Sequence, residues 1–71
     1  MTRENELRAA IVRAGYTMEQ VAKALMLSAG GFWKKLTNRS EFTATEIKKL
    51  QELLHLTNAE RDYIFFATNS D

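Results

Sequence analysis

Apolar residues recur three and four positions apart along most of the chain, the spacing that places side chains on one face of an α-helix. The segment with Ile47, Leu50, Leu53 and Leu54 shows this clearly, because most of the residues between them are charged or polar. No stretch alternates apolar and polar residues as a half-buried strand would. The pattern therefore predicts an all-α protein with helices at about 4–14, 18–25, 29–36, 44–54 and 58–67.

Capping residues and glycine indicate where these helices begin and end, because the chain contains no proline. Gly15 follows the first helix and can take the left-handed conformation that ends a helix. His55, at the end of the fourth helix, is interpreted as a capping residue that suits the helix dipole. Ser28 is expected to cap the third helix. Three helices are expected to begin with a capping box, formed by Thr17 with Gln20, Thr43 with Glu46, and Thr57 with Glu60.

Residues 17–36 predict two short helices separated by a tight break at 26–27. Their apolar residues lie where two steeply crossing helices need contacts, which is the helix-turn-helix pattern. In that pattern the second helix is presented to a partner, usually the major groove of DNA. Its outward positions here are Ala29, Gly30 and Gly31, which have no side chain able to read the edge of a base.

Length and composition limit the number of domains and the chemistry. Seventy-one residues make one small domain, expected to span 1–71 with a frayed tail at 68–71. The chain has no cysteine and one histidine, which excludes disulfides, thiolate sites and multi-histidine metal sites. It has no nucleophile–base pair and no phosphate-binding glycine loop, so we expect no enzyme activity, no metal and no cofactor. No apolar run reaches the length of a membrane span and no signal-peptide pattern opens the chain, so the cytoplasm is the expected compartment.

The charges are unevenly distributed, although the net charge is only +1. Residues 1–36 carry six basic and three acidic side chains, a net charge of +3. Residues 37–71 carry four basic and six acidic side chains, a net charge of −2. The basic half is compatible with a surface that faces phosphates, but the charge is low for a protein whose affinity comes mainly from neutralising DNA.

Together, these features resemble the five-helix Cro/repressor-type helix-turn-helix domain of phage and bacterial regulators. The resemblance covers residues 7–66, and the run 40–47 is similar to the loop and fourth-helix start of small temperate-phage regulators from Gram-positive bacteria. It implies a compact five-helix bundle that regulates transcription in a lysogenic/lytic switch and binds double-stranded operator DNA through the helix at 28–36. The residues that carry the resemblance are Gly15, Tyr16 and Thr17 before the second helix, Val21 and Ala22 within it, Leu27 and Ser28 at the turn, and Phe32 and Leu36 in the third helix.

Two departures from the family pattern weaken the direct reading of bases. Met26 stands at a turn position that is usually glycine, and it would be strained in a left-handed conformation. The start of the third helix usually carries polar side chains, where this chain has alanine and two glycines. Ser28, Trp33 and Lys34 remain for base contacts, and Lys34, Lys35 and Arg39 would hold phosphates. The candidate DNA- or partner-binding residues are Ser28, Ala29, Gly30, Trp33, Lys34, Lys35, Asn38 and Arg39.

A second hypothesis makes the same domain a modulator of repression, which resembles the anti-repressor proteins of temperate phages. It would bind the DNA-reading domain of a cognate phage repressor and have little DNA affinity of its own. Trp33 would then be an exposed anchor for a protein partner, whereas in the alternative it packs in the core. The run 63–66 has more aromatic area than a two-turn helix can hide, so Tyr63, Phe65 and Phe66 form a candidate partner or homodimer surface. The sequence leaves DNA binding, repressor binding and a combination of the two open.

Overall fold

Five α-helices make up most of the computed structural model, which describes residues 1–66. They are α1 (Glu4–Arg13), α2 (Met18–Ala24), α3 (Ala29–Leu36), α4 (Ala44–Leu54) and α5 (Asn58–Phe65). The described residues contain no strand, and the observed helices begin at or within one residue of the predicted positions. The all-α prediction is therefore confirmed for this part of the chain. The predicted last residue of the fifth helix, at 67, and the predicted frayed tail, 68–71, lie outside the described residues.

All four predicted N-caps form as the sequence indicates. Thr17, Thr43 and Thr57 each accept a hydrogen bond from the third backbone N–H of their helix, and the Gln or Glu there accepts one from the threonine N–H. Ser28 Oγ accepts the N–H of Gly31 at 3.0 Å. These caps satisfy backbone donors that have no partner inside the helix, and each contributes about 1 kcal/mol.

The helices enclose one apolar core. Five side chains with almost no exposed surface lie at its centre, and three aromatic rings extend it toward the end of α5. Phe42 stacks edge-on against Phe32 on one side and Phe65 on the other, with ring centroids 5.9 and 5.6 Å apart. Phe65 is only 4% exposed, so its predicted place on a partner surface is wrong: it belongs to the core. The five central residues are Leu7, Ile11, Val21, Leu36 and Leu50.

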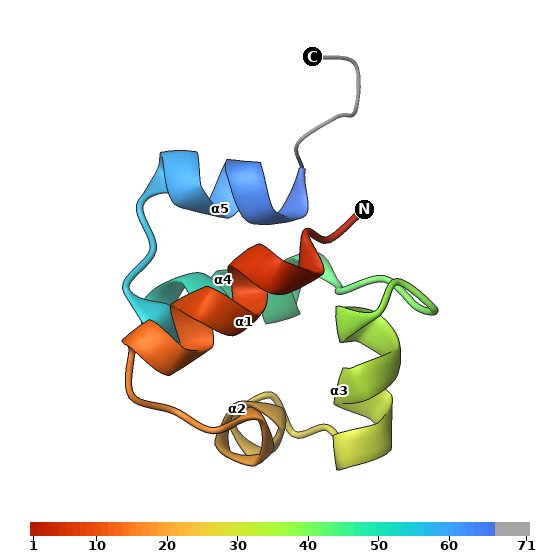
Figure 1. Ribbon diagram of the computed structural model, residues 1–71. Helices are drawn as coiled ribbons and strands as arrows, with labels where there is room; N and C mark the ends of the chain where they lie inside the picture. Colours follow the sequence, from red (N-terminus) through yellow and green to blue (C-terminus); the bar gives the residue numbers. More distant parts are fainter. Residues whose placement is uncertain (67–71) are drawn as a thin grey trace.

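The helices lie in tiers, with α5 above, α1 and α4 across the middle, and α2 and α3 below (Figure 1). Figure 1 looks along the axis of α2, whereas α3 runs up the side of the view, so these two helices cross steeply. The chain between them covers 25–28 and is held by the Leu27 N–H, which donates to the Ala22 carbonyl at 2.9 Å. This arrangement places α3 at one edge of the bundle, where one side of it stays uncovered.

Four of the residues 1–66 have a positive φ, and three of them bear on sequence predictions. Gly15 (φ 84°) follows α1, and His55 (φ 55°) caps α4 in the left-handed conformation. Met26 also takes the left-handed conformation (φ 60°). Its side chain is 85% exposed, so it has little packing within the protein to offset the strain. The turn between α2 and α3 therefore carries the backbone strain that the sequence predicted for a non-glycine residue there. Asn38 is the fourth, with φ 65°.

Candidate interface on α3

The first turn of α3 is bare backbone on its outer side. Ser28, Ala29 and Gly30 are all exposed. A Cβ added at Gly30 would meet no atom within 4 Å, whereas one added at Gly31 would lie 3.1 Å from Ser28 Oγ. Ser28 Oγ already accepts a hydrogen bond from the helix. Since the residues after it have almost no side chain, another molecule can approach the backbone of this turn closely.

Trp33 borders this surface and is 48% exposed, which answers the question that the sequence left open. The guanidinium carbon of Arg8 lies 5.0 Å from the centre of the Trp33 ring, within the range of a cation–π contact. Arg8 Nε in turn donates to Glu4 Oε2 at 3.0 Å. Contacts from Glu4 to Arg8, and from Arg8 to Trp33, thus connect α1 with α3.

Lys35 faces the opposite side of α3 and is bound to α4. Its Nζ lies 2.6 and 2.8 Å from the two carboxylate oxygens of Glu46, and the two side chains are only 16% and 14% exposed. Burial alone would raise the pKa of Glu46, but hydrogen bonds from Lys35 and from the Thr43 N–H, together with the Lys35 charge, hold it below its ordinary value. Lys35 therefore stabilises the fold, and its charge is largely cancelled before any partner arrives.

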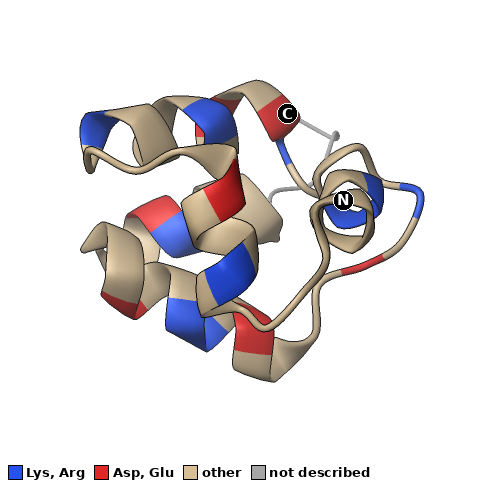
Figure 2. Cartoon of the chain, turned by 90° about the horizontal axis from the view of Figure 1, so that it is seen from below, with Lys and Arg blue, Asp and Glu red and all other residues tan. Residues whose placement is uncertain are grey.

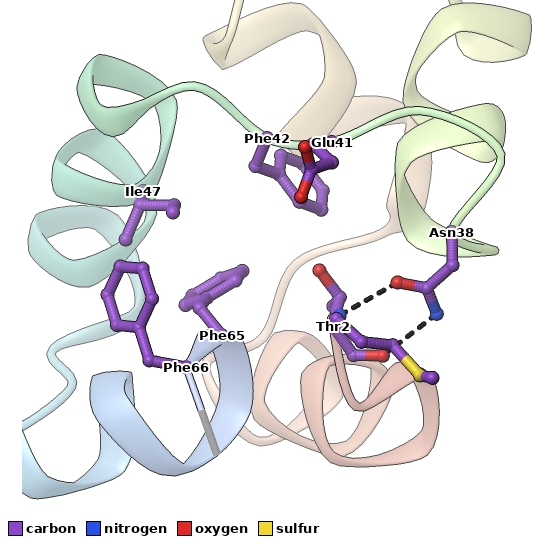
Figure 3. A pocket seen from close by; sticks show the side chains of 8 residues that line it. Thr2, Asn38, Glu41, Phe42, Ile47, Phe65 and Phe66 are labelled. Carbon is purple, nitrogen blue, oxygen red and sulfur yellow. Dashed lines mark hydrogen bonds between the residues drawn. The ribbon is translucent and has the colours of Figure 1, made fainter. Parts of the chain in front are cut away.

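Asn38 is also engaged within the chain. Its Oδ1 accepts the N–H of Thr2 at 2.7 Å, and its Nδ2 donates to the Thr2 carbonyl at 2.9 Å (Figure 3). This pair of bonds fixes residues 1–3 beside the loop after α3, where Thr2 is buried. Of the four predicted residues at the end of α3 and in the loop, Lys34 and Arg39 are exposed, and neither forms an ion pair within residues 1–66.

The aromatic run at the end of α5 divides between core and surface. Tyr63 and Phe66 are 50% and 57% exposed, as expected for a partner surface, while Phe65 points inward. Figure 3 shows Phe65 and Phe66 beside Phe42 and Ile47 in a pocket of about 140 Å³. The Tyr63 ring is covered on one face by the Arg3 guanidinium, 4.5 Å from its centre. This surface lies on α5, at the far side of the bundle from α2 (Figure 1).

Charges of both signs are mixed over the molecule seen from below in Figure 2. In that view α3 is seen nearly end-on at the right with basic positions on it. The loop beyond it carries charges of both signs, from Arg39 and Glu41. The exposed side of α3 therefore has a local excess of positive charge but no extended basic face. Within residues 1–66 no group of three or more His, Cys, Asp or Glu side chains could hold a metal ion, and no helix there is long and apolar enough to cross a membrane.

Comparisons of the chain with protein families, with curated proteins and with solved structures gave no match. The residue that sequence reasoning missed is Arg8, which it placed only off the apolar face of the first helix. Nothing in the sequence pairs Arg8 with Trp33, because 25 positions separate them and only the packing of α1 beside α3 brings them together.

Proposed function

We propose that the chain is a helix-turn-helix transcription regulator of the Cro/repressor type, which binds duplex DNA by placing α3 in the major groove. The observation that supports this most is the position of α3 at one edge of the bundle, crossing α2 steeply after a four-residue connection and leaving one side uncovered. A groove about 12 Å wide accepts one α-helix, so an uncovered helix side of this kind matches it.

Backbone contacts would supply most of the affinity. Lys34 and Arg39 are exposed and unpaired within residues 1–66, so both can meet phosphates beside the groove. The side chains of Lys35 and Asn38 are held by Glu46 and Thr2, so we leave these two out of the proposed contacts. Base reading would be weak, because the first turn of α3 presents only alanine and glycine beyond its serine cap.

Salt dependence tests the proposal directly. The chain is titrated against a fluorescently labelled 20-base-pair duplex of mixed sequence, and anisotropy is followed between 25 and 200 mM salt. Two phosphate contacts give a slope of log K against log salt of about −1.8, and each further contact adds about −0.9. Lys34→Gln should lower the affinity and flatten the slope by about 0.9.

The matched control is Lys48→Gln, which removes the same charge from the side of α4 that faces Arg61 of α5 and Phe66 just after that helix. It should leave the slope unchanged. No binding by the unmodified chain at 25 mM salt, or equal effects of the two substitutions, would contradict DNA binding through α3.

A second function is supported by a separate observation, the exposed apolar side chains near the same helix. Trp33 is half exposed and Met26 is 85% exposed, and aromatic and methionine side chains are enriched at protein interfaces. We infer that this side of the chain can also bind the DNA-reading domain of a cognate repressor, as a modulator of repression would. Titration of the neighbouring repressor with the chain, without DNA, measures this association. Trp33→Ala should abolish it while the circular dichroism spectrum stays helical, and unchanged association would refute it.

A further inference from the structure

Arg8 is an arginine with a fixed position and two unused nitrogens. Its guanidinium is held against the Trp33 ring, and Glu4 accepts only from its Nε. Within residues 1–66, its two terminal nitrogens donate no hydrogen bond, and the side chain is 34% exposed. A guanidinium held in this way presents its terminal N–H groups to a phosphate without first losing its rotational freedom.

Arg8 of α1 also lies beside a flank of α3 that carries none of the basic residues predicted to bind phosphate. Successive residues of a helix are about 100° apart, so Trp33 and Lys35 lie on opposite flanks of α3, with Gly30 and Lys34 between them. The Trp33 flank faces Arg8 of α1, and the Lys35 flank faces Glu46 of α4. A helix in the major groove has a phosphate backbone on each side, so cations are needed at both flanks.

We propose that Arg8 binds a backbone phosphate on the Trp33 flank of α3, and that Trp33 is the positioning residue for its guanidinium. This inference rests on the proposed DNA binding and extends the interface from α3 and its loop to α1. It also changes the role predicted for Trp33: the ring orients a cation toward the phosphates and leaves base reading to other groups.

The salt slope of the 20-base-pair duplex tests the contact. With Arg8, Lys34 and Arg39 all on phosphates, the unmodified chain should show a slope of about −2.7, and Arg8→Gln should reduce it to about −1.8. The same relation gives an affinity loss of about eightfold at 0.1 M salt. The matched control, Arg13→Gln, removes the same charge from the other end of α1, where Arg13 lies near Glu60 and Tyr63 of α5. It should leave the slope unchanged and change the affinity by no more than about twofold.

A double-mutant cycle tests the positioning role of Trp33. Trp33→Ala should weaken binding by about threefold to tenfold when Arg8 is present and have little effect in the Arg8→Gln background. Trp33→Phe keeps an aromatic face under the guanidinium and should restore most of the affinity. A purely structural role of Trp33 would instead weaken binding equally in both backgrounds.

The outcomes separate the two proposals. If the unmodified chain binds no duplex at 25 mM salt, the proposed function is wrong and the role of Arg8 falls with it. If it binds, and Arg8→Gln matches Arg13→Gln in slope and affinity, the inference on Arg8 is overturned while the proposed function stands.

Discussion

Replacing Gly30 by alanine should make the chain more stable and make it a weaker binder. Glycine in a helix costs roughly 0.5–1 kcal/mol relative to alanine, because its backbone loses more freedom on folding. A Cβ at Gly30 meets no atom within 4 Å, so the added methyl group brings no clash to offset this gain. Gly30 lies in the first turn of α3, so we take the lower end, about 0.5 kcal/mol. For a domain of this size that raises Tm by about 2–4 °C.

Binding should change in the opposite direction. If the backbone of α3 lies against the DNA or the repressor, a methyl group in that contact forces the two surfaces apart. Overpacking of this kind costs about 1–3 kcal/mol, and 1.4 kcal/mol corresponds to a tenfold loss of affinity. Stability is measured by thermal unfolding and affinity by anisotropy with the same duplex, on the same protein samples.

Ala59→Gly is the matched reverse substitution. Ala59 is the second residue of α5 and is exposed, as Gly30 is the second residue of α3, and α5 lies on the other side of the bundle. It should lower Tm by a similar amount and leave the affinity unchanged. If Gly30→Ala is more stable and binds as tightly as the unmodified chain, no partner approaches the first turn of α3, and the reasoning for this interface is wrong.

Two further predictions concern stability. Met26→Gly should raise the free energy of unfolding by about 0.5–1 kcal/mol in urea titrations, because it relieves the left-handed strain of a side chain that is 85% exposed. An unchanged or lower value would mean that the Met26 side chain makes contacts worth as much as the strain. Glu46→Gln keeps an acceptor for the Thr43 N–H but leaves Lys35 without its counter-charge, so at pH 7 it should destabilise the chain by about 1–3 kcal/mol. The lowered pKa of Glu46 means that its ionised form stabilises the fold above the ordinary value of 4.5 and that this contribution is lost as pH falls through the folded pKa. The gap between the two proteins should therefore narrow as pH falls below 4.5, and a gap of constant size from pH 7 through the acid range would refute the assignment to the ion pair.

The local features of the fold could be predicted from the sequence because their causes are local. A capping box needs two residues three positions apart, and helical periodicity needs one segment, so Thr17, Thr43 and Thr57 mark their helices directly. Gly15 ends its helix for the same kind of reason, since one residue takes the left-handed conformation. The position of His55 as a cap was also predicted, but from the helix dipole and not from the left-handed conformation that it takes.

The assignment of the candidate site was less accurate because it depends on contacts between distant segments. Lys35 and Arg39 look equivalent in the sequence, yet only Lys35 meets a carboxylate, 11 residues away on α4. Asn38 is hydrogen-bonded to the backbone of Thr2, 36 residues away, and the Arg8 guanidinium lies against Trp33. The packing of the helices decides which basic side chains remain unpaired and can bind a partner. The periodicity of the sequence does not show which segments pack together.

The number of basic side chains available around α3 limits how tightly one chain could bind DNA. Lys35 is held by Glu46, so Lys34 and Arg39 remain, together with Arg8, whose Nε donates to Glu4 but whose two terminal nitrogens are unused within residues 1–66. Three phosphate contacts are few compared with proteins that make six to ten. A single chain of this kind should bind DNA weakly and without strong preference for a sequence. A second copy of the chain in the complex would double the contacts and bring the slope near −5.4, whereas a repressor would add phosphate contacts of its own. On the proposed function, α3 would therefore bind DNA more tightly with a second DNA-reading surface beside it, and Trp33 and Met26 are exposed apolar side chains that the partner supplying that surface could contact.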